Sequence, residues 1–123
     1  MSDKINILKK NLKKNIWTDE KDHIYPYLLE ERGKYIGKSK LLLKPTTTAE
    51  VSEILRICYK NKISVVPQGG RTGLSGGTIP NPEKDEIIIS MEKMNKIISI
   101  DKKSFNMVTQ SGCTLEDIKK AAK

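Results

Sequence analysis

Apolar residues in the middle of the chain recur with the spacing of one face of an α-helix. They are Val51, Ile54, Leu55 and Cys58, at positions i, i+3, i+4 and i+7. Thr47 and Glu50 precede this stripe with the S/T-x-x-E pattern of a capping box, in which two side chains satisfy free backbone N–H groups. Because the two signals agree, the sequence predicts a helix from Thr47 to about Lys60.

Two short apolar runs flank this predicted helix. Leu41–Lys44 is ended by Pro45, and Ile63–Val66 is rich in β-branched residues, which favour strands. Strand, helix and strand at this spacing are typical of a βαβ unit with parallel strands and a right-handed crossover. The chain after residue 66 therefore leaves the carboxyl end of a parallel strand, where α/β sheets bind their ligands.

The rest of the chain adds short strands and terminal helices. Polar turns separate three further strand candidates, at 86–90, 97–101 and 106–110. A helix start follows at Thr114–Asp117. Fold class is therefore predicted as α+β with an α/β-like part: a βαβ unit, then a short mixed or antiparallel set of strands, with helices at the N-terminus.

The N-terminal residues predict two helices. Residues 3–16 alternate apolar and Lys positions as in a basic amphipathic helix. Such a helix also suits a membrane surface or a partner, but its commoner role is to pack by a narrow apolar stripe. Thr18 or Asp19 can cap a second short helix that runs through Leu29 despite Pro26.

The most distinctive stretch is PQGGRTGLSGGT, residues 67–78, which holds five of the eight glycines. Glycine permits positive φ, so such a loop can turn several backbone N–H groups toward one anion. Arg71 can add a bidentate donor, and the stretch contains no carboxylate, which suits a phosphate. A flexible linker is the alternative, but the preceding apolar strand favours a built site.

Two well-known phosphate loops do not fit this stretch. A P-loop needs Gly-Lys-Ser/Thr, which does not occur here. The dinucleotide fingerprint G-x-G-x-x-G needs a second glycine where Arg71 stands, and a helix where Pro80 and Pro82 follow. A phosphate held here is therefore expected to be bound by loop amides alone, without a helix dipole.

Composition narrows the possible partners. The net charge is +8 with a pI near 9.5, which raises the possibility of nucleic acid. Nearly all the cations are Lys spread along the chain, and aromatic residues make up only 5%. A base-stacking surface needs clustered Arg and aromatic side chains, so no nucleic-acid partner is expected.

Cysteine and histidine usage indicates no metal or redox site. Cys58 and Cys113 fit no metal or C-x-x-C spacing and are expected to be reduced thiols, and His23 is expected to be a surface or packing residue. No apolar run is long enough to span a membrane. The N-terminus lacks the apolar region of a secretory signal peptide, so a cytoplasmic location is expected.

Three segments together resemble a known family. They are LLLKPTTTAEVSEILRICYKNKISVVPQGGRTGLSGGT, EIIISMEKMNKIISID and VTQSGCTLEDI. They are similar to the first half of the FAD-binding domain of p-cresol methylhydroxylase/vanillyl-alcohol oxidase flavoproteins, within which the D-lactate, D-2-hydroxyglutarate and glycolate dehydrogenases or oxidases show the nearest pattern. The resemblance implies an N-terminal helical lead-in at 1–38 and an incomplete FAD-binding domain at 39–123.

The resemblance also implies roles for individual residues. In the family, the glycine loop wraps the FAD pyrophosphate through backbone amides, and the resemblance implies that FAD would be bound non-covalently. The cofactor-binding positions implied by this likeness are Pro67, Gln68, Gly69, Gly70, Arg71, Thr72, Gly73, Leu74, Gly76, Gly77 and Gly112. Of these, Gly112 is implied by the similarity of its S-G-C-T-L turn to a second approach to the cofactor, and Met94–Ile97 is read as structural.

No catalytic residue and no metal ligand can be assigned, because the family carries both in parts that do not match this chain. Catalysis and tight FAD binding by the chain alone are therefore not expected. The sequence leaves several alternatives open: a piece of a D-2-hydroxy-acid dehydrogenase, half of a split enzyme, or a non-catalytic module for another phosphate ligand or a partner. An exposed sheet edge would invite a second chain or a self-dimer.

Overall fold

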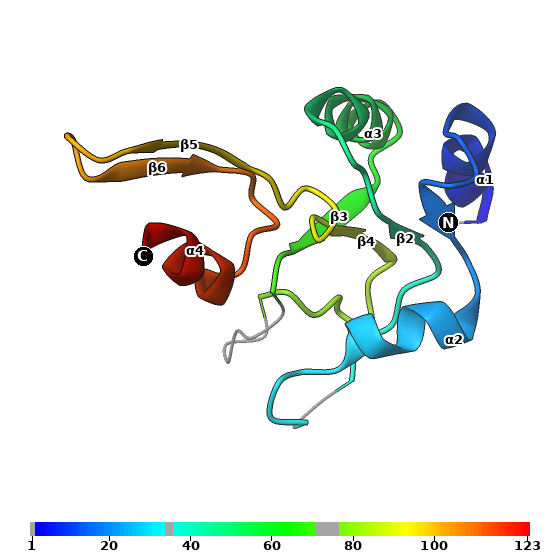
Figure 1. Ribbon diagram of the computed structural model, residues 1–123. Helices are drawn as coiled ribbons and strands as arrows, with labels where there is room; N and C mark the ends of the chain where they lie inside the picture. The colour runs from blue at the N-terminus through cyan, green and yellow to red at the C-terminus, as the bar shows by residue number, and fades with distance from the viewer. Residues whose placement is uncertain (1, 34–35, 71–76) are drawn as a thin grey trace.

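A four-stranded sheet forms the body of the protein in the computed structural model, which describes residues 2–33, 36–70 and 77–123 (Figure 1). The strands are β1 (Trp17–Thr18), β2 (Leu42–Leu43), β3 (Ser64–Gln68) and β4 (Glu86–Ser90). The order across the sheet is β1-β2-β4-β3. β4 runs parallel to both β2 and β3, whereas β1 is antiparallel to β2. The carboxyl ends of three strands therefore meet at one edge of the sheet.

Helices cover both faces of this sheet. They are α1 (Ser2–Asn11), α2 (Lys21–Ile24), the 3-10 helix η1 (Tyr25–Leu28) and α3 (Thr48–Lys60), whereas α4 (Leu115–Ala122) lies apart from the sheet. α1 and α3 lie on one side of the sheet and α2 on the other (Figure 1). The expected α+β class is confirmed, with helices and a mixed sheet.

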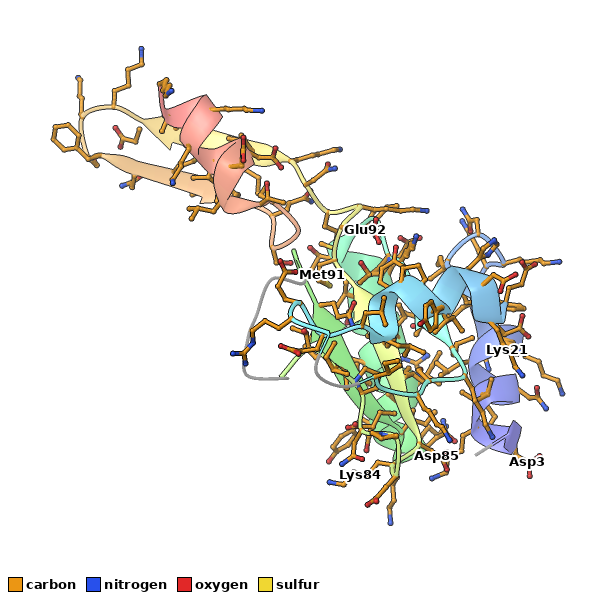
Figure 2. The ribbon with its side chains drawn as sticks, turned by 90° about the horizontal axis from the view of Figure 1, so that it is seen from below. Asp3, Lys21, Lys84, Asp85, Met91 and Glu92 are labelled. Atoms are coloured by element: carbon orange, nitrogen blue, oxygen red, sulfur yellow. The ribbon has the colours of Figure 1, made fainter. Side chains whose placement is uncertain are left out.

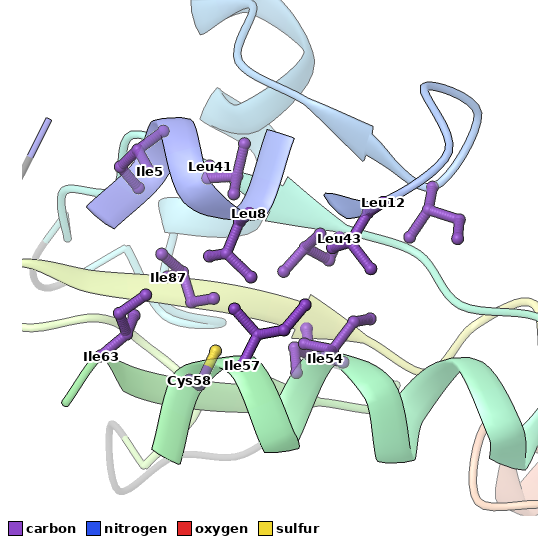
Figure 3. Packing of buried hydrophobic residues seen from close by; sticks show 12 residues of the cluster. Ile5, Leu8, Leu12, Leu41, Leu43, Ile54, Ile57, Cys58, Ile63 and Ile87 are labelled. Atoms are coloured by element: carbon purple, nitrogen blue, oxygen red, sulfur yellow. The ribbon is translucent and has the colours of Figure 1, made fainter. Parts of the chain in front are cut away.

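Side chains that alternate along β2 and β4 contribute to the core on both faces of the sheet. Leu41, Leu43, Ile87 and Ile89 belong to the larger buried cluster, with side chains of α1 and α3 (Figure 3). The intervening residues Leu42 and Ile88 belong to the smaller cluster, with Ile24 and Tyr27 on the opposite face. Because successive side chains of a strand point to opposite faces, a continuous apolar run covers both.

The predicted central helix is confirmed, and its N-terminus is more elaborate than a capping box. Thr47 is the N-cap, and its hydroxyl accepts a hydrogen bond from the Glu50 N–H at 3.1 Å. The Glu50 carboxylate reaches one residue further back than expected and accepts from the N–H and hydroxyl of Thr46. These hydrogen bonds lower the pKa of Glu50.

Several local predictions are corrected by the structure. The two strands that flank α3 are parallel but not neighbours, since β4 lies between them. The first helix ends at Asn11 rather than near residue 16. The second becomes α2 followed by η1, because Pro26 cannot continue an α-helix. Pro67 belongs to β3, which tolerates proline because it is an edge strand.

A hairpin and the last helix stand apart from the body. The antiparallel pair β5 (Ile97–Asp101) and β6 (Asn106–Thr109) extends away from the sheet, with α4 beside it (Figures 1 and 2). Every residue of β5 is exposed, and α4 has no buried residue. An isolated hairpin and a helix of this length are only marginally stable in water. This part of the chain therefore lacks a core of its own among the described residues.

Candidate functional site

Three of the predicted glycines come together at the carboxyl edge of the parallel strands. Gly69 and Gly70 directly follow β3, and Gly112 precedes α4. All three line one surface pocket of ≈ 240 Å³. The other described residues of this pocket are Glu92, Asn95, Thr114 and Asp117. We call it the glycine pocket.

The remaining predicted cofactor residues fall outside this pocket or outside the described part of the chain. Arg71, Thr72, Gly73, Leu74 and Gly76 lie in the undescribed segment 71–76. Gly77 is exposed, Pro67 is exposed at the edge of the sheet, and Gln68 is buried behind it. Among the described loop glycines, Gly69, Gly70 and Gly77 do not have the positive φ that the sequence led us to expect.

Gln68 holds the base of the glycine stretch in place. Its side chain is 1% exposed, and its Nε2 donates hydrogen bonds to the carbonyl oxygens of Tyr27 (2.8 Å) and Thr78 (2.6 Å). The backbone carbonyl of Gln68 accepts from the N–H of Met91, which follows β4. The amide thus connects η1, β3 and the chain that returns from the loop, and this positions both ends of residues 69–77.

Gly112 is fixed by close backbone packing. Its N–H donates to the carbonyl of Met94 at 2.8 Å. A Cβ atom at this position would lie 1.7 Å from the Met91 carbonyl oxygen and 2.7 Å from that of Met94. Since those atoms are backbone, no side chain can rotate away to make room. Gly112 is therefore needed to bring the start of α4 against the end of β4.

A polar network borders the glycine pocket at Glu92. The Glu92 carboxylate accepts hydrogen bonds from the Tyr27 hydroxyl and from Ser90 Oγ, and Lys44 Nζ lies 3.6 Å away. Burial and the bond to Glu92 raise the pKa of Tyr27. Burial would lower the pKa of Lys44, but its contacts with Tyr27 and Glu92 raise it. At neutral pH Tyr27 is thus a neutral donor and Lys44 a cation beside the Glu92 carboxylate. Sequence reasoning missed this network, because its members are distant in the chain.

The N-terminus of α4 also reaches the glycine pocket, although the sequence led us to expect loop amides without a helix dipole. Thr114 is the N-cap of α4, and its hydroxyl accepts from the Asp117 N–H at 3.2 Å while the Asp117 carboxylate accepts from the Thr114 N–H at 3.4 Å. The capping signal at Thr114–Asp117 was visible in the sequence, but its position beside Gly69 was not. Free N–H groups and the helix dipole both favour an anion at such an end.

Cys58 and His23 do not line this pocket, and Cys113 stands between its lining residues Gly112 and Thr114. Cys58 is a buried residue of α3, and burial raises its pKa to about 11; neither it nor Cys113 forms a disulfide. His23 is exposed on α2, within 3.4 Å of Glu20. In the part of the chain that the structure describes, no group of three or more potential metal ligands occurs. No helix among those residues has the length and apolar character needed to cross a membrane.

Two solved structures have the fold of this chain. Alkyldihydroxyacetonephosphate synthase has a similar fold, with a TM-score of 0.80 and 20% identity over 98% of this chain and 24% of that one. p-Cresol methylhydroxylase with substrate bound gives a TM-score of 0.76 and 20% identity over the same shares of the two chains. At this identity the two structures establish the fold alone.

The family described as "FAD binding domain" matches residues 39–123, and the chain belongs to it.

Individual relatives found by sequence agree with this family assignment. A probable D-2-hydroxyglutarate dehydrogenase of Oryza sativa subsp. indica is 41% identical over 95% of this chain and 21% of its own length. The corresponding enzyme of Rattus norvegicus is 50% identical over 67% of this chain and 15% of its own. A putative D-lactate dehydrogenase of Schizosaccharomyces pombe is 48% identical over 69% of this chain and 16% of its own length. The chain thus spans about a fifth or less of these relatives.

The expected cytoplasmic location is wrong on this comparison. The matched relatives from rice, rat and fission yeast are all named mitochondrial proteins. The physical signals used for the expectation exclude a secretory signal peptide, but they do not distinguish the cytoplasm from the mitochondrion.

Proposed function

We propose that the chain holds the diphosphate of FAD as the first half of an FAD-binding domain, residues 39–123, with residues 1–38 packed on it. The whole enzyme would be a D-2-hydroxy-acid dehydrogenase or oxidase acting on D-2-hydroxyglutarate, D-lactate or glycolate. FAD, when bound, supplies the acceptor for the hydride of the hydroxyl-bearing carbon. Among the described residues none is placed as the base, so the chain alone is proposed to bind the cofactor rather than to catalyse.

The convergence of Gly69, Gly70 and Gly112 with the first turn of α4 carries this proposal. A Cβ at Gly70 would meet nothing within 4 Å, and at Gly69 its nearest neighbour would be the Ser111 carbonyl at 3.7 Å. The pocket side of both residues is therefore bare backbone that an anion can approach closely. We assign the same backbone role to Arg71, Thr72, Gly73, Leu74, Gly76 and Gly77, with Pro67 and Gln68 as support.

Size and charge set what the glycine pocket can hold. Its ≈ 240 Å³ suits a diphosphate but is smaller than the space that a ligand of FAD size needs. Two carboxylates border it, yet Glu92 lies beside Lys44 and Asp117 is engaged in capping α4. Of the two carboxylates only Glu92 has a cation beside it, so the affinity for an anion must come from backbone N–H groups. We therefore expect weak binding of FAD by this chain.

Gly70→Asp tests this assignment. The site of Gly70 is open, so the fold should persist, but a carboxylate beside the diphosphate should weaken ADP binding about tenfold through charge repulsion. Binding is measured by equilibrium dialysis, with circular dichroism to confirm folding. Ser52→Asp, which adds the same charge on an exposed position of α3, is the matched control and should bind like the wild type. Equal ADP affinity of the two variants would remove Gly70 from the site.

We also propose that a second polypeptide covers the hairpin and α4, either the remainder of an FAD-binding domain or another copy of this chain. The exposed apolar side chains support this: Ile98 is 65% exposed, Phe105 94% and Leu115 67%. Ile97, Ile100 and Val108 of the same hairpin are exposed as well, and so many exposed apolar residues in one part of a monomer are unusual. Half of a split enzyme and a non-catalytic partner-binding module both remain compatible with such a surface.

Light scattering tests whether a second polypeptide covers the hairpin and α4. We expect the chain to self-associate as its concentration rises, or to form a stable complex with the remainder of the rice relative's FAD-binding domain supplied as a separate chain. The double variant Ile98→Ser with Phe105→Ser should reduce either association about tenfold, since it removes two exposed apolar anchors. Tyr59→Ser on α3, at a residue 90% exposed, is the control. A strict monomer that does not bind the added half would contradict the partner surface.

A further inference from the structure

A second pocket lies at the end of the parallel strands opposite the glycine pocket. Its volume is ≈ 400 Å³, within the range of small-molecule sites. It forms where β4 begins, whereas the glycine pocket forms where β3 and β4 end. Figure 2 shows this separation, with Lys84 and Asp85 at one end of the body and Met91 and Glu92 at the other. The two pockets share no described lining residue.

Two separate segments, residues 21–28 and the turn at Pro82, form the apolar walls of this pocket. Ile24 and Leu28 come from α2 and η1, and Pro82 comes from the turn before β4. Tyr25 adds an aromatic side chain that is 51% exposed. Burying such surface against a ligand is favourable in proportion to the apolar area removed from water. The walls therefore suit a ligand with an aliphatic or aromatic body.

Lysines from these two segments and from residues 38–40 also line the pocket. They are Lys21, Lys38, Lys40 and Lys84. Within the described chain, none of their ammonium groups takes part in an ion pair or a hydrogen bond. A carboxylate brought to this rim therefore meets cations that are not already neutralised. We call this site the lysine-rimmed pocket.

Acidic residues reduce this positive charge but do not cancel it. Asp85 and Glu86 also line the pocket, so four lysines face two carboxylates and the excess is two positive charges. Glu86 is further engaged, because its Oε1 accepts a hydrogen bond from the Asn81 N–H at 2.6 Å. Ser39 is turned inward, where its hydroxyl donates to the Glu86 carbonyl at 2.8 Å. The polar groups left for a ligand are mainly ammonium donors.

We propose that the lysine-rimmed pocket binds a small amphipathic anion, a carboxylate carried on an aliphatic or aromatic body. The anion would lie among the lysines and its apolar body against Ile24, Tyr25 and Leu28. Small dicarboxylates and 2-hydroxy acids lack the apolar body that these walls require. The site is thus separate from the proposed FAD site in both position and ligand chemistry.

Sodium octanoate is the probe that tests this site, with 1-octanol as the uncharged match. In amide NMR titrations of the whole chain, octanoate should shift residues 21–28, 38–40 and 82–86 saturably. Octanol should bind about tenfold more weakly, because it lacks the charge that the lysines attract. Equal binding of octanol, shifts confined to the β5–β6 hairpin, or no saturable shift would each overturn the proposal.

Two pairs of variants sharpen this test. Lys38→Gln with Lys84→Gln should weaken octanoate about tenfold, while Lys102→Gln with Lys103→Gln, the same charge change at the hairpin tip, should leave it unchanged. Tyr25→Ser should weaken both probes, whereas Tyr59→Ser on α3 should weaken neither. An octanoate affinity that the Lys38/Lys84 pair does not change would overturn the site. A failure of ADP binding at the glycine pocket would not affect any of these outcomes.

Discussion

Gly112→Ala should destabilise the chain by about 3 kcal/mol or more, because the new methyl group has no space. It would stand 1.7 Å from the Met91 carbonyl oxygen and 2.6 Å from its carbonyl carbon. The clash can be relieved only if the backbone at residue 112 moves, and this movement breaks the hydrogen bond from the N–H of residue 112 to the Met94 carbonyl. We expect the hairpin and α4 to detach from the sheet before the body unfolds. Urea denaturation measures the loss, and amide hydrogen exchange locates it.

Gly70→Ala is the matched control for this prediction. It makes the same chemical change at the same pocket, but nothing lies within 4 Å of its Cβ position and its φ is not positive. Its effect on stability should stay within about 0.5 kcal/mol. If both substitutions cost the same, the close packing of Gly112 against Met91 would not be what holds α4 in place.

Gln68→Met should cost about 2 kcal/mol and loosen both ends of the glycine stretch. The substitution keeps the size of the side chain but removes the donor to the Tyr27 and Thr78 carbonyls, and unpaired buried acceptors are costly. Part of the cost is offset, because Gln68 Oε1 has no hydrogen-bond partner among the residues that the structure describes. Urea denaturation gives the free energy, and amide exchange at Gly69 and Gly70 should quicken.

Gln110→Met is the comparison for Gln68. Gln110 accepts a hydrogen bond from the Lys96 N–H at 2.9 Å at an exposed position, where water can replace it. We expect a cost of about 0.5 kcal/mol or less there. Equal costs at the two positions would show that burial of the Gln68 amide contributes nothing to the support of the loop.

Local sequence signals were sufficient for the elements that carry the site. The Thr47 cap and the apolar stripe predicted α3, and the five loop glycines marked the segment that leaves the carboxyl end of β3. The capping pattern at Thr114 predicted α4. Each of these three signals comes from residues within a few positions of one another, so it can be recognised in the sequence without knowledge of the fold.

The order of the strands and the contacts between distant segments could not be predicted from such local signals. The insertion of β4 between β2 and β3 depends on which apolar faces pack together, and several strand orders share one hydrophobic pattern. The two-residue strand β1 is too short to show periodicity. The contacts of Tyr27 and Lys44 with Glu92 join segments far apart in the chain. For Gly112, only family resemblance suggested a role, since its contact with Met91 is invisible in a local window.

Parallel titrations with FAD, ADP and riboflavin test most directly whether the chain holds the diphosphate half of the cofactor. Amide NMR should show FAD and ADP binding with similar affinity and shifting Gly69, Gly70 and Gly112. Riboflavin, which has no phosphate, should leave these amides unchanged. Riboflavin binding as tight as that of FAD, or no shift of these three glycines with ADP, would contradict the proposed diphosphate site.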